Sequence, residues 1–116
     1  MHEPINDDFK KVVFDDAIPG TIALECVFGL LCNNFTLEKT IDILTRKKDV
    51  FEIEDCPIEI GSKADLTIFN PEVNYVFSEN HILSSSNNCA YLDKNLKGIV
   101  YGAINNNKAT LNKLWT

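Results

Sequence analysis

The sequence has few of the residues from which metal and redox sites are usually built. It contains two histidines and four cysteines, and no cysteine stands in a Cys-x-x-Cys pair. Zinc sites are recognised in a sequence by such pairs or by closely spaced histidines. We therefore interpret the two histidines, His2 and His81, as surface residues rather than ligands. The cysteines are expected to be buried free thiols, and they are Cys26, Cys32, Cys56 and Cys89.

Positive charge and long apolar runs are also scarce. Lys and Arg number 11 against 17 Asp and Glu, so the formal net charge is -6. An acidic chain without a basic patch is a poor partner for nucleic acid or for an anionic membrane. No apolar run reaches the roughly 18 residues that a membrane-spanning helix needs, and no signal-peptide pattern opens the chain. With 45% apolar residues, the chain is expected to be one folded, soluble, cytoplasmic domain.

A turn followed by an apolar stretch is the element around which the rest of the chain is organised. Pro19-Gly20 predicts the turn, because proline fixes φ and glycine permits a positive φ. Thr21 is the expected N-cap of a helix that ends near Asn33-Asn34. This helix is apolar nearly all round, which is typical of a helix buried in a larger body. A second, amphipathic helix is predicted from its N-cap Thr36 to the cations at 46–48.

From residue 50 the apolar period changes to two residues, which predicts short β-strands. The period-two stretches lie at 50–53, 58–60, 64–69, 73–77, 98–105 and 108–111, and three to five short strands are expected from them. Asn70-Pro71 should end the third stretch, and Asn105 to Asn107 should form the turn of a hairpin between the last two. These strands are too few and too short to close a barrel, so they would leave open edges. The sequence thus predicts an α/β or α+β chain.

Four stretches, in this order, resemble the dihydroorotase family of the amidohydrolase superfamily, and specifically its longer, multifunctional-complex type. They are His2-Glu3-Pro4, Phe14 to Glu25, Ile60 to Pro71 and Leu96 to Val100. Together they cover nearly the whole chain. The resemblance implies that residues 1–49 are the last loop and helices of a (β/α)8 barrel. It also implies that residues 50–116 form a C-terminal, small, mostly antiparallel β-subdomain, which the N-terminal segment of a full chain would share.

The resemblance further implies a zinc enzyme of pyrimidine biosynthesis that hydrolyses a cyclic amide. Its metal ligands come from an early His-x-His, a carboxylated lysine and two further histidines, and this sequence has no His-x-His. We therefore expect zinc in the full-length family and no metal ligand or catalytic residue here. The family's catalytic aspartate would fall at Met1, and a histidine that holds the substrate corresponds to Ile5. Of the substrate-binding residues, only Pro19 and Gly20 carry over, Gly20 through its backbone N–H.

Three hypotheses for the function remain open at this point. The chain is the C-terminal portion of a dihydroorotase, inactive by itself, or a non-catalytic dihydroorotase-like scaffold that pairs with aspartate transcarbamoylase. Ile5 favours the scaffold, because truncation does not explain a substitution inside the retained segment. Without the resemblance, a small α+β binding or assembly module is the alternative. In each case exposed apolar faces predict self-association, or cover by a missing N-terminal barrel segment.

Overall fold

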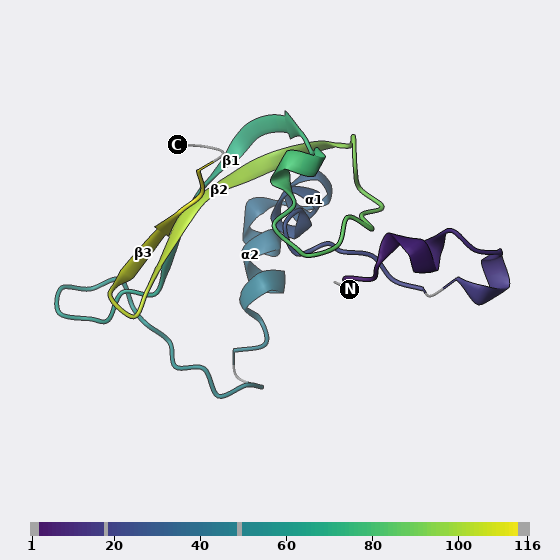
Figure 1. The fold of residues 1–116 in the computed structure, drawn as a ribbon. Helices are drawn as coiled ribbons and strands as arrows, with labels where there is room; N and C mark the ends of the chain where they lie inside the picture. Colours follow the sequence, from purple (N-terminus) through teal and green to yellow (C-terminus); the bar gives the residue numbers. More distant parts are fainter. Residues whose placement is uncertain (1–2, 18, 49, 114–116) are drawn as a thin grey trace.

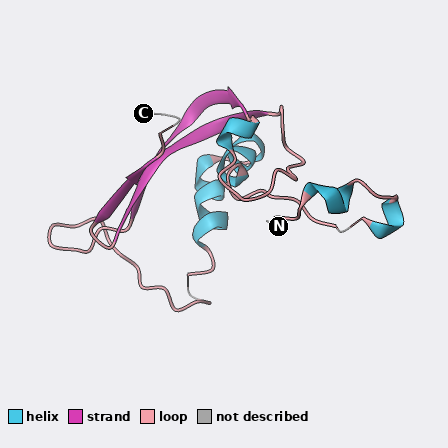
Figure 2. Ribbon diagram, in the orientation of Figure 1, coloured by secondary structure: helices cyan, strands magenta, loops and turns pink. Residues whose placement is uncertain are grey.

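A computed structural model describes residues 3–17, 19–48 and 50–113. A three-stranded antiparallel sheet forms one layer, and two helices pack beneath it (Figures 1 and 2). The strands are β1 (Leu66–Val76), β2 (Asn95–Asn105) and β3 (Lys108–Leu111), in the order β1-β2-β3. The helices are α1 (Val27–Asn34) and α2 (Leu37–Thr45), and the three 3-10 turns are η1 (Asp7–Lys10), η2 (Phe14–Asp16) and η3 (Glu79–His81).

Helix α1 begins later than the sequence predicts. The expected N-cap, Thr21, instead donates its hydroxyl hydrogen to the Asn88 carbonyl oxygen (2.8 Å). The same hydroxyl oxygen accepts from the Ala90 amide (2.9 Å). The helix starts only at Val27, so the predicted start is wrong, whereas its predicted end at Asn34 is confirmed. The Thr21 hydroxyl therefore bonds residues far along the chain instead of capping the helix.

Helix α1 is also less buried than an apolar helix inside a larger body would be. Gly29 is its one fully buried residue, and its other side chains are half-buried or exposed. Gly29 allows the helix to approach the sheet closely, because a Cβ there would lie 3.0 Å from both the Leu96 Cβ and the Tyr75 hydroxyl. Helix α2 is as predicted: the Thr36 hydroxyl accepts from the Lys39 amide at 3.4 Å.

The strand predictions are confirmed at the end of the chain and corrected before it. The strands predicted at 64–69 and 73–77 merge into one strand, β1, which spans only Leu66–Val76 and runs through Pro71 with a register shift between Asn70 and Asn74. Proline has no N–H to donate, so it is tolerated in an edge strand at such an irregularity. The β2–β3 hairpin is confirmed, and Asn106 and Asn107 supply the positive φ angles (48° and 60°) that its turn requires.

The segments 50–53 and 58–60 are not strands, which corrects two of the predicted elements. Their alternating apolar residues find no neighbouring strand among the described residues, and the relative exposure of Ile58 and Ile60 is 86% and 109%. An alternating pattern becomes a strand only when a partner supplies hydrogen bonds and a surface to cover. The division of the chain at residues 49 and 50 stays a prediction, and Asp49 lies outside the described residues.

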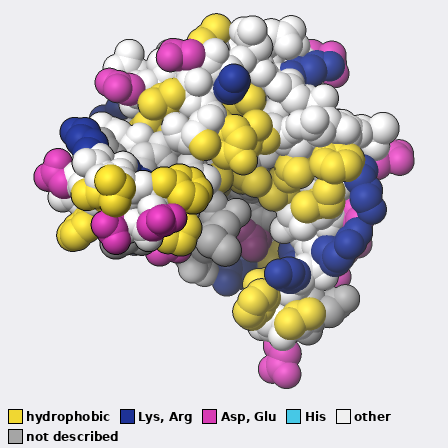
Figure 3. Space-filling view, turned by 90° about the vertical axis from the view of Figure 1, so that its right-hand side faces the viewer, with side chains coloured by type: hydrophobic (Ala, Val, Ile, Leu, Met, Phe, Trp, Pro, Cys, Tyr) yellow, Lys and Arg dark blue, Asp and Glu magenta, His cyan; other side chains and the backbone are white. Residues whose placement is uncertain are grey.

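The core is small and lies where α1 meets β2 and the end of β1. Its fully buried cluster is Cys26, Phe77 and Leu96. All four cysteines are free thiols, as predicted, but only Cys26 is buried. Elsewhere the described part of the chain leaves many large apolar side chains in solvent, and Figure 3 shows such side chains across one face. The chain thus carries more apolar surface than its own elements cover.

Candidate functional site

The two segments that the sequence analysis assigns to the site lie side by side. The Glu3 amide donates to the Thr21 carbonyl oxygen at 2.7 Å. Gly20 has a φ of +129°, and a Cβ there would lie 2.6 Å from the Glu3 Cγ and 3.2 Å from the Ile5 Cδ1. Only glycine combines this backbone angle with so close a neighbour. The fold therefore places Gly20 directly against residues 3–5.

Ile5 is an anchoring residue in this structure. Its side chain is 8% exposed. Its amide donates to the Asn88 Oδ1 (3.3 Å), and its carbonyl oxygen accepts from the Ser86 hydroxyl. Where the resemblance implies a histidine that reaches the substrate, this chain has an apolar side chain that packs inward.

Gly20 is held through its carbonyl oxygen rather than through its amide. The oxygen accepts from the Lys10 Nζ (2.7 Å) and from the Asn88 Nδ2 (3.5 Å). Within the described part of the chain, the Gly20 amide donates to no other residue. That amide is the group expected to contact a substrate, while Pro19 is exposed and has no N–H. The substrate-binding role of Pro19 and Gly20 stays a prediction.

Sequence reasoning missed the residue that joins these segments, Asn88. It lies in the stretch Ser84 to Asn88, which reads as a polar loop. In the structure its side chain donates to the Glu3 carbonyl oxygen (2.8 Å) and accepts from the Ser86 hydroxyl (2.6 Å). Short polar side chains readily bond nearby backbone, so the run signals local hydrogen bonding. It does not say which distant backbone those side chains hold.

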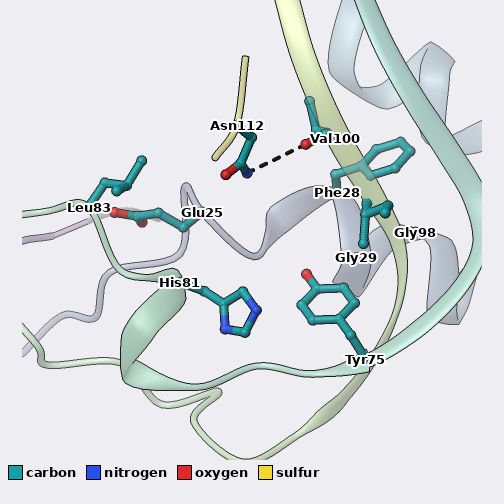
Figure 4. Close-up of a pocket in the computed structure, with 10 residues that line it drawn as sticks. Glu25, Phe28, Gly29, Tyr75, His81, Leu83, Gly98, Val100 and Asn112 are labelled. Carbon is teal, nitrogen blue, oxygen red and sulfur yellow. Dashed lines mark hydrogen bonds between the residues drawn. The ribbon is translucent and has the colours of Figure 1, made fainter. Parts of the chain in front are cut away.

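Away from Gly20 and Asn88, a hollow of about 110 Å³ lies between α1, η3 and β2 (Figure 4). His81 lines it and is half-buried rather than on the open surface as expected. Its Nδ1 accepts from the Ser78 amide (3.0 Å), and its ring centroid lies 5.3 Å from that of Tyr75. Burial raises the pKa of Tyr75 to about 12, so this phenol stays neutral. Glu25 also lines the hollow and accepts from the Ser84 amide (2.8 Å).

Zinc does not fit the residues that the structure describes. In residues 3–17, 19–48 and 50–113, no three His, Cys, Asp or Glu side chains are grouped so that they could hold a metal ion. His2, the other histidine of the chain, lies outside the described residues. Nor does the described part contain a helix long and apolar enough to cross a membrane.

Comparison with known proteins agrees with the resemblance to dihydroorotase. The chain is 31% identical over 114 residues to the dihydroorotase of Chlorobaculum tepidum, and 30% identical over 114 residues to that of Caldicellulosiruptor saccharolyticus. The dihydroorotase of Aquifex aeolicus is 29% identical over 113 residues. The chain is similar to dihydroorotase. Each match covers 92% of this chain, which spans only 26% of the length of each relative.

A solved structure of D-hydantoinase supports the same fold. The two structures superpose with a TM-score of 0.75 at 18% sequence identity, over 92% of this chain and 25% of that chain. The predicted fold class is therefore confirmed: the chain folds like part of the D-hydantoinase structure, with two helices and a small antiparallel sheet. No protein-family model matches the chain.

Proposed function

We propose that this chain is the C-terminal portion of a dihydroorotase-like protein, which hydrolyses a cyclic amide in cytoplasmic pyrimidine biosynthesis. On this proposal the chain is not catalytic by itself. Zinc and its ligands would belong to the remainder of the protein, and this chain would contribute the loop with Pro19 and Gly20. The similarity to dihydroorotases over 92% of the chain supports the assignment of the whole protein to a reaction of the dihydroorotase kind.

The observation that carries the proposal is the amount of surface that the chain leaves uncovered. Its radius of gyration is 16.5 Å, whereas a compact domain of this length has about 13 Å. Its accessible surface is 8748 Å², whereas a folded monomer of 13.1 kDa exposes about 6,400 Å². The difference exceeds the roughly 800 Å² that one partner buries in a standard interface. Further protein is thus expected to cover this chain, either a barrel segment or a second copy.

The second candidate function is a non-catalytic dihydroorotase-like scaffold, for example a partner of aspartate transcarbamoylase. Ile5 supports it, because the side chain is buried and offers no hydrogen bond to a substrate carboxylate. Pro19 supports it as well, because it removes one backbone donor from the loop. The two candidates differ in whether the assembled protein turns over dihydroorotate.

A chimera separates them. The quarter of the Caldicellulosiruptor saccharolyticus enzyme that matches this chain is replaced by residues 2–116, so that the enzyme keeps its own residue where the resemblance places the catalytic aspartate. Dihydroorotate hydrolysis is then measured with zinc present. A portion of an enzyme gives a folded, active chimera. A scaffold gives a folded, inactive chimera in which Ile5→His restores turnover. The chain alone should be inactive. Turnover by the chain alone, or a chimera that does not fold, would contradict the proposal.

A further inference from the structure

The loop between η3 and β2 holds the segment that carries Gly20 in place. We propose that Asn88, in this loop, is a positioning residue that sets where the Gly20 amide lies. The consequence for a substrate rests on the proposed function, whereas the mechanical role does not. Asn88 would act through Gly20 and touch no substrate itself.

The side chain of Asn88 joins two separate stretches of backbone. Its Nδ2 donates to the carbonyl oxygens of Glu3 (2.8 Å) and Gly20 (3.5 Å). Its Oδ1 accepts from the Ile5 amide (3.3 Å) and the Ser86 hydroxyl (2.6 Å). A carboxamide offers two donor hydrogens and one oxygen with two lone pairs. The single Ser86 hydroxyl hydrogen is shared between the Asn88 Oδ1 and the Ile5 carbonyl oxygen. The Asn88 side chain therefore engages both its amide nitrogen and its oxygen, a combination that Ala and Asp lack.

The backbone of the same residue holds the other side of the turn. The Asn88 carbonyl oxygen accepts from the Ile22 amide (3.2 Å) and from the Thr21 hydroxyl (2.8 Å). Apart from the bond with Ser86, the contacts of Asn88 described here join residues 66 to 85 positions apart in the sequence. Residues 3–5 and 20–22 are thus both bonded to one loop residue, in addition to the direct bond from the Glu3 amide to the Thr21 carbonyl oxygen.

The segment between these two stretches depends on this attachment. Residues 6–17 project from the body of the molecule (Figure 1), and Phe14 in them is 93% exposed. Besides Asn88, three contacts hold the Gly20 end of this projection: the Lys10 Nζ on the Gly20 carbonyl, the Glu3 amide on the Thr21 carbonyl and the Ala90 amide on the Thr21 hydroxyl. The Gly20 carbonyl and the Gly20 amide lie in neighbouring peptide units joined at the Gly20 Cα. The hydrogen bonds to the carbonyl oxygen therefore restrain the amide through the φ and ψ angles of Gly20.

The first test uses the 116-residue chain and amide hydrogen exchange. Removing the side chain in Asn88→Ala should speed exchange at Glu3 and Ile5 about tenfold or more, because their hydrogen bonds depend on this residue. Asn88→Asp retains the shape but loses both donor hydrogens, and should also speed exchange at Glu3. The matched control is Asn87→Ala, whose exposed side chain makes no hydrogen bond with a described residue. Amides of the β2–β3 hairpin should be unchanged in each variant.

Equal exchange at Glu3 and Ile5 in Asn88→Ala and Asn87→Ala would overturn the proposal. If Asn88→Ala does not fold, the comparison uses Asn88→Asp instead, and an exchange rate at Glu3 equal to that in Asn87→Ala would overturn the proposal. In the chimera described above, Asn88→Asp should raise KM about tenfold with kcat nearly unchanged, as loss of uniform binding does. A purely structural role would lower the active fraction, and hence apparent kcat, at constant KM. An inactive chimera contradicts the proposed function alone, because the exchange result still decides the role of Asn88.

Discussion

The core around Phe77 and the segment 50–60 are both rich in apolar residues, but the structure treats them in opposite ways. Phe77 and Leu96 are 1% exposed, whereas Ile58 and Ile60 are almost wholly in solvent. Their apolar character is similar, so hydrophobicity alone does not explain the difference. The core residues lie where α1 packs against the sheet, whereas Ile58 lines an open hollow beside α2 and β1 that leaves its side chain in solvent. An apolar side chain is buried only where another element covers it.

The hydrogen bonds of the two regions differ in the same way. Beside the core, in the loop that contains Asn88 and Cys89, they join residues more than 60 positions apart. In the segment 57–62 they join near neighbours, as from the Ser62 amide to the Glu59 carbonyl oxygen (3.1 Å). Long-range bonds accompany a closed core, and short-range bonds accompany an open chain. The segment 50–60 is therefore the part that further protein is best placed to order.

The largest expected effect comes from truncating one aromatic residue in each region. Phe77→Ala should lower the free energy of unfolding by about 3–5 kcal/mol, because it empties the centre of the core. Phe51→Ala, at a side chain 68% exposed, should change it by no more than about 0.5 kcal/mol. Urea unfolding followed by circular dichroism measures both. Similar losses in the two variants would contradict the contrast between a closed core and an open surface.

A smaller difference is expected between two glycines with positive φ. Gly98 (φ +99°) lies in the core, and a Cβ there would be 2.9 Å from the Phe28 Cε1. Gly98→Ala should therefore cost about 2–4 kcal/mol from backbone strain and overpacking together. Gly61 (φ +91°) has nothing within 4 Å of the same position, so Gly61→Ala should cost only about 1 kcal/mol. Equal losses in urea unfolding would show that packing around Gly98 is loose.

Alkaline pH should weaken the core through its buried thiol. Burial raises the pKa of Cys26 from 9.0 to about 12. Between these values the unfolded chain has lost the proton and the folded chain retains it, so stability falls as pH rises. The thiol contributes a slope of at most about 1.4 kcal/mol per pH unit. Cys26→Ala should flatten the decline between pH 9 and 12, and Cys56→Ala is the control outside the core. An unchanged slope in Cys26→Ala would contradict this origin.

The smallest effect is expected at the N-terminus of α2, where the structure is local and exposed. The Thr36 hydroxyl accepts from the Lys39 amide at 3.4 Å, a long hydrogen bond. Thr36→Ala should lower the free energy of unfolding by about 0.5 kcal/mol, the lower end for such a cap. Thr45→Ala, near the end of the same helix, serves as the control for removing a threonine. A loss above that of Gly61→Ala would mean that α2 is coupled to the core.

The sequence by itself determined the elements whose chemistry is local. Thr36 marks the start of α2, because its hydroxyl bonds an amide three residues along the chain. Asn106 and Asn107 mark the β2–β3 turn, because asparagine tolerates a positive φ. The ordered stretches that resemble dihydroorotase predicted the fold class, since they report a fold already seen elsewhere. They also indicated that residues 3–5 and Gly20 belong to the candidate site.

Tertiary structure alone decided the rest. It moved the start of α1 to Val27, because loop 84–90 takes the Thr21 hydroxyl, and it joined two predicted strands through Pro71. The segment 50–60 forms no strand in it. The tertiary structure also brings Asn88 within hydrogen-bonding distance of residues 3–5 and 20–22. Each of these outcomes depends on a partner far along the chain, or on the lack of one. Periodicity and turn chemistry extend over only a few residues, so they do not show which distant segments meet.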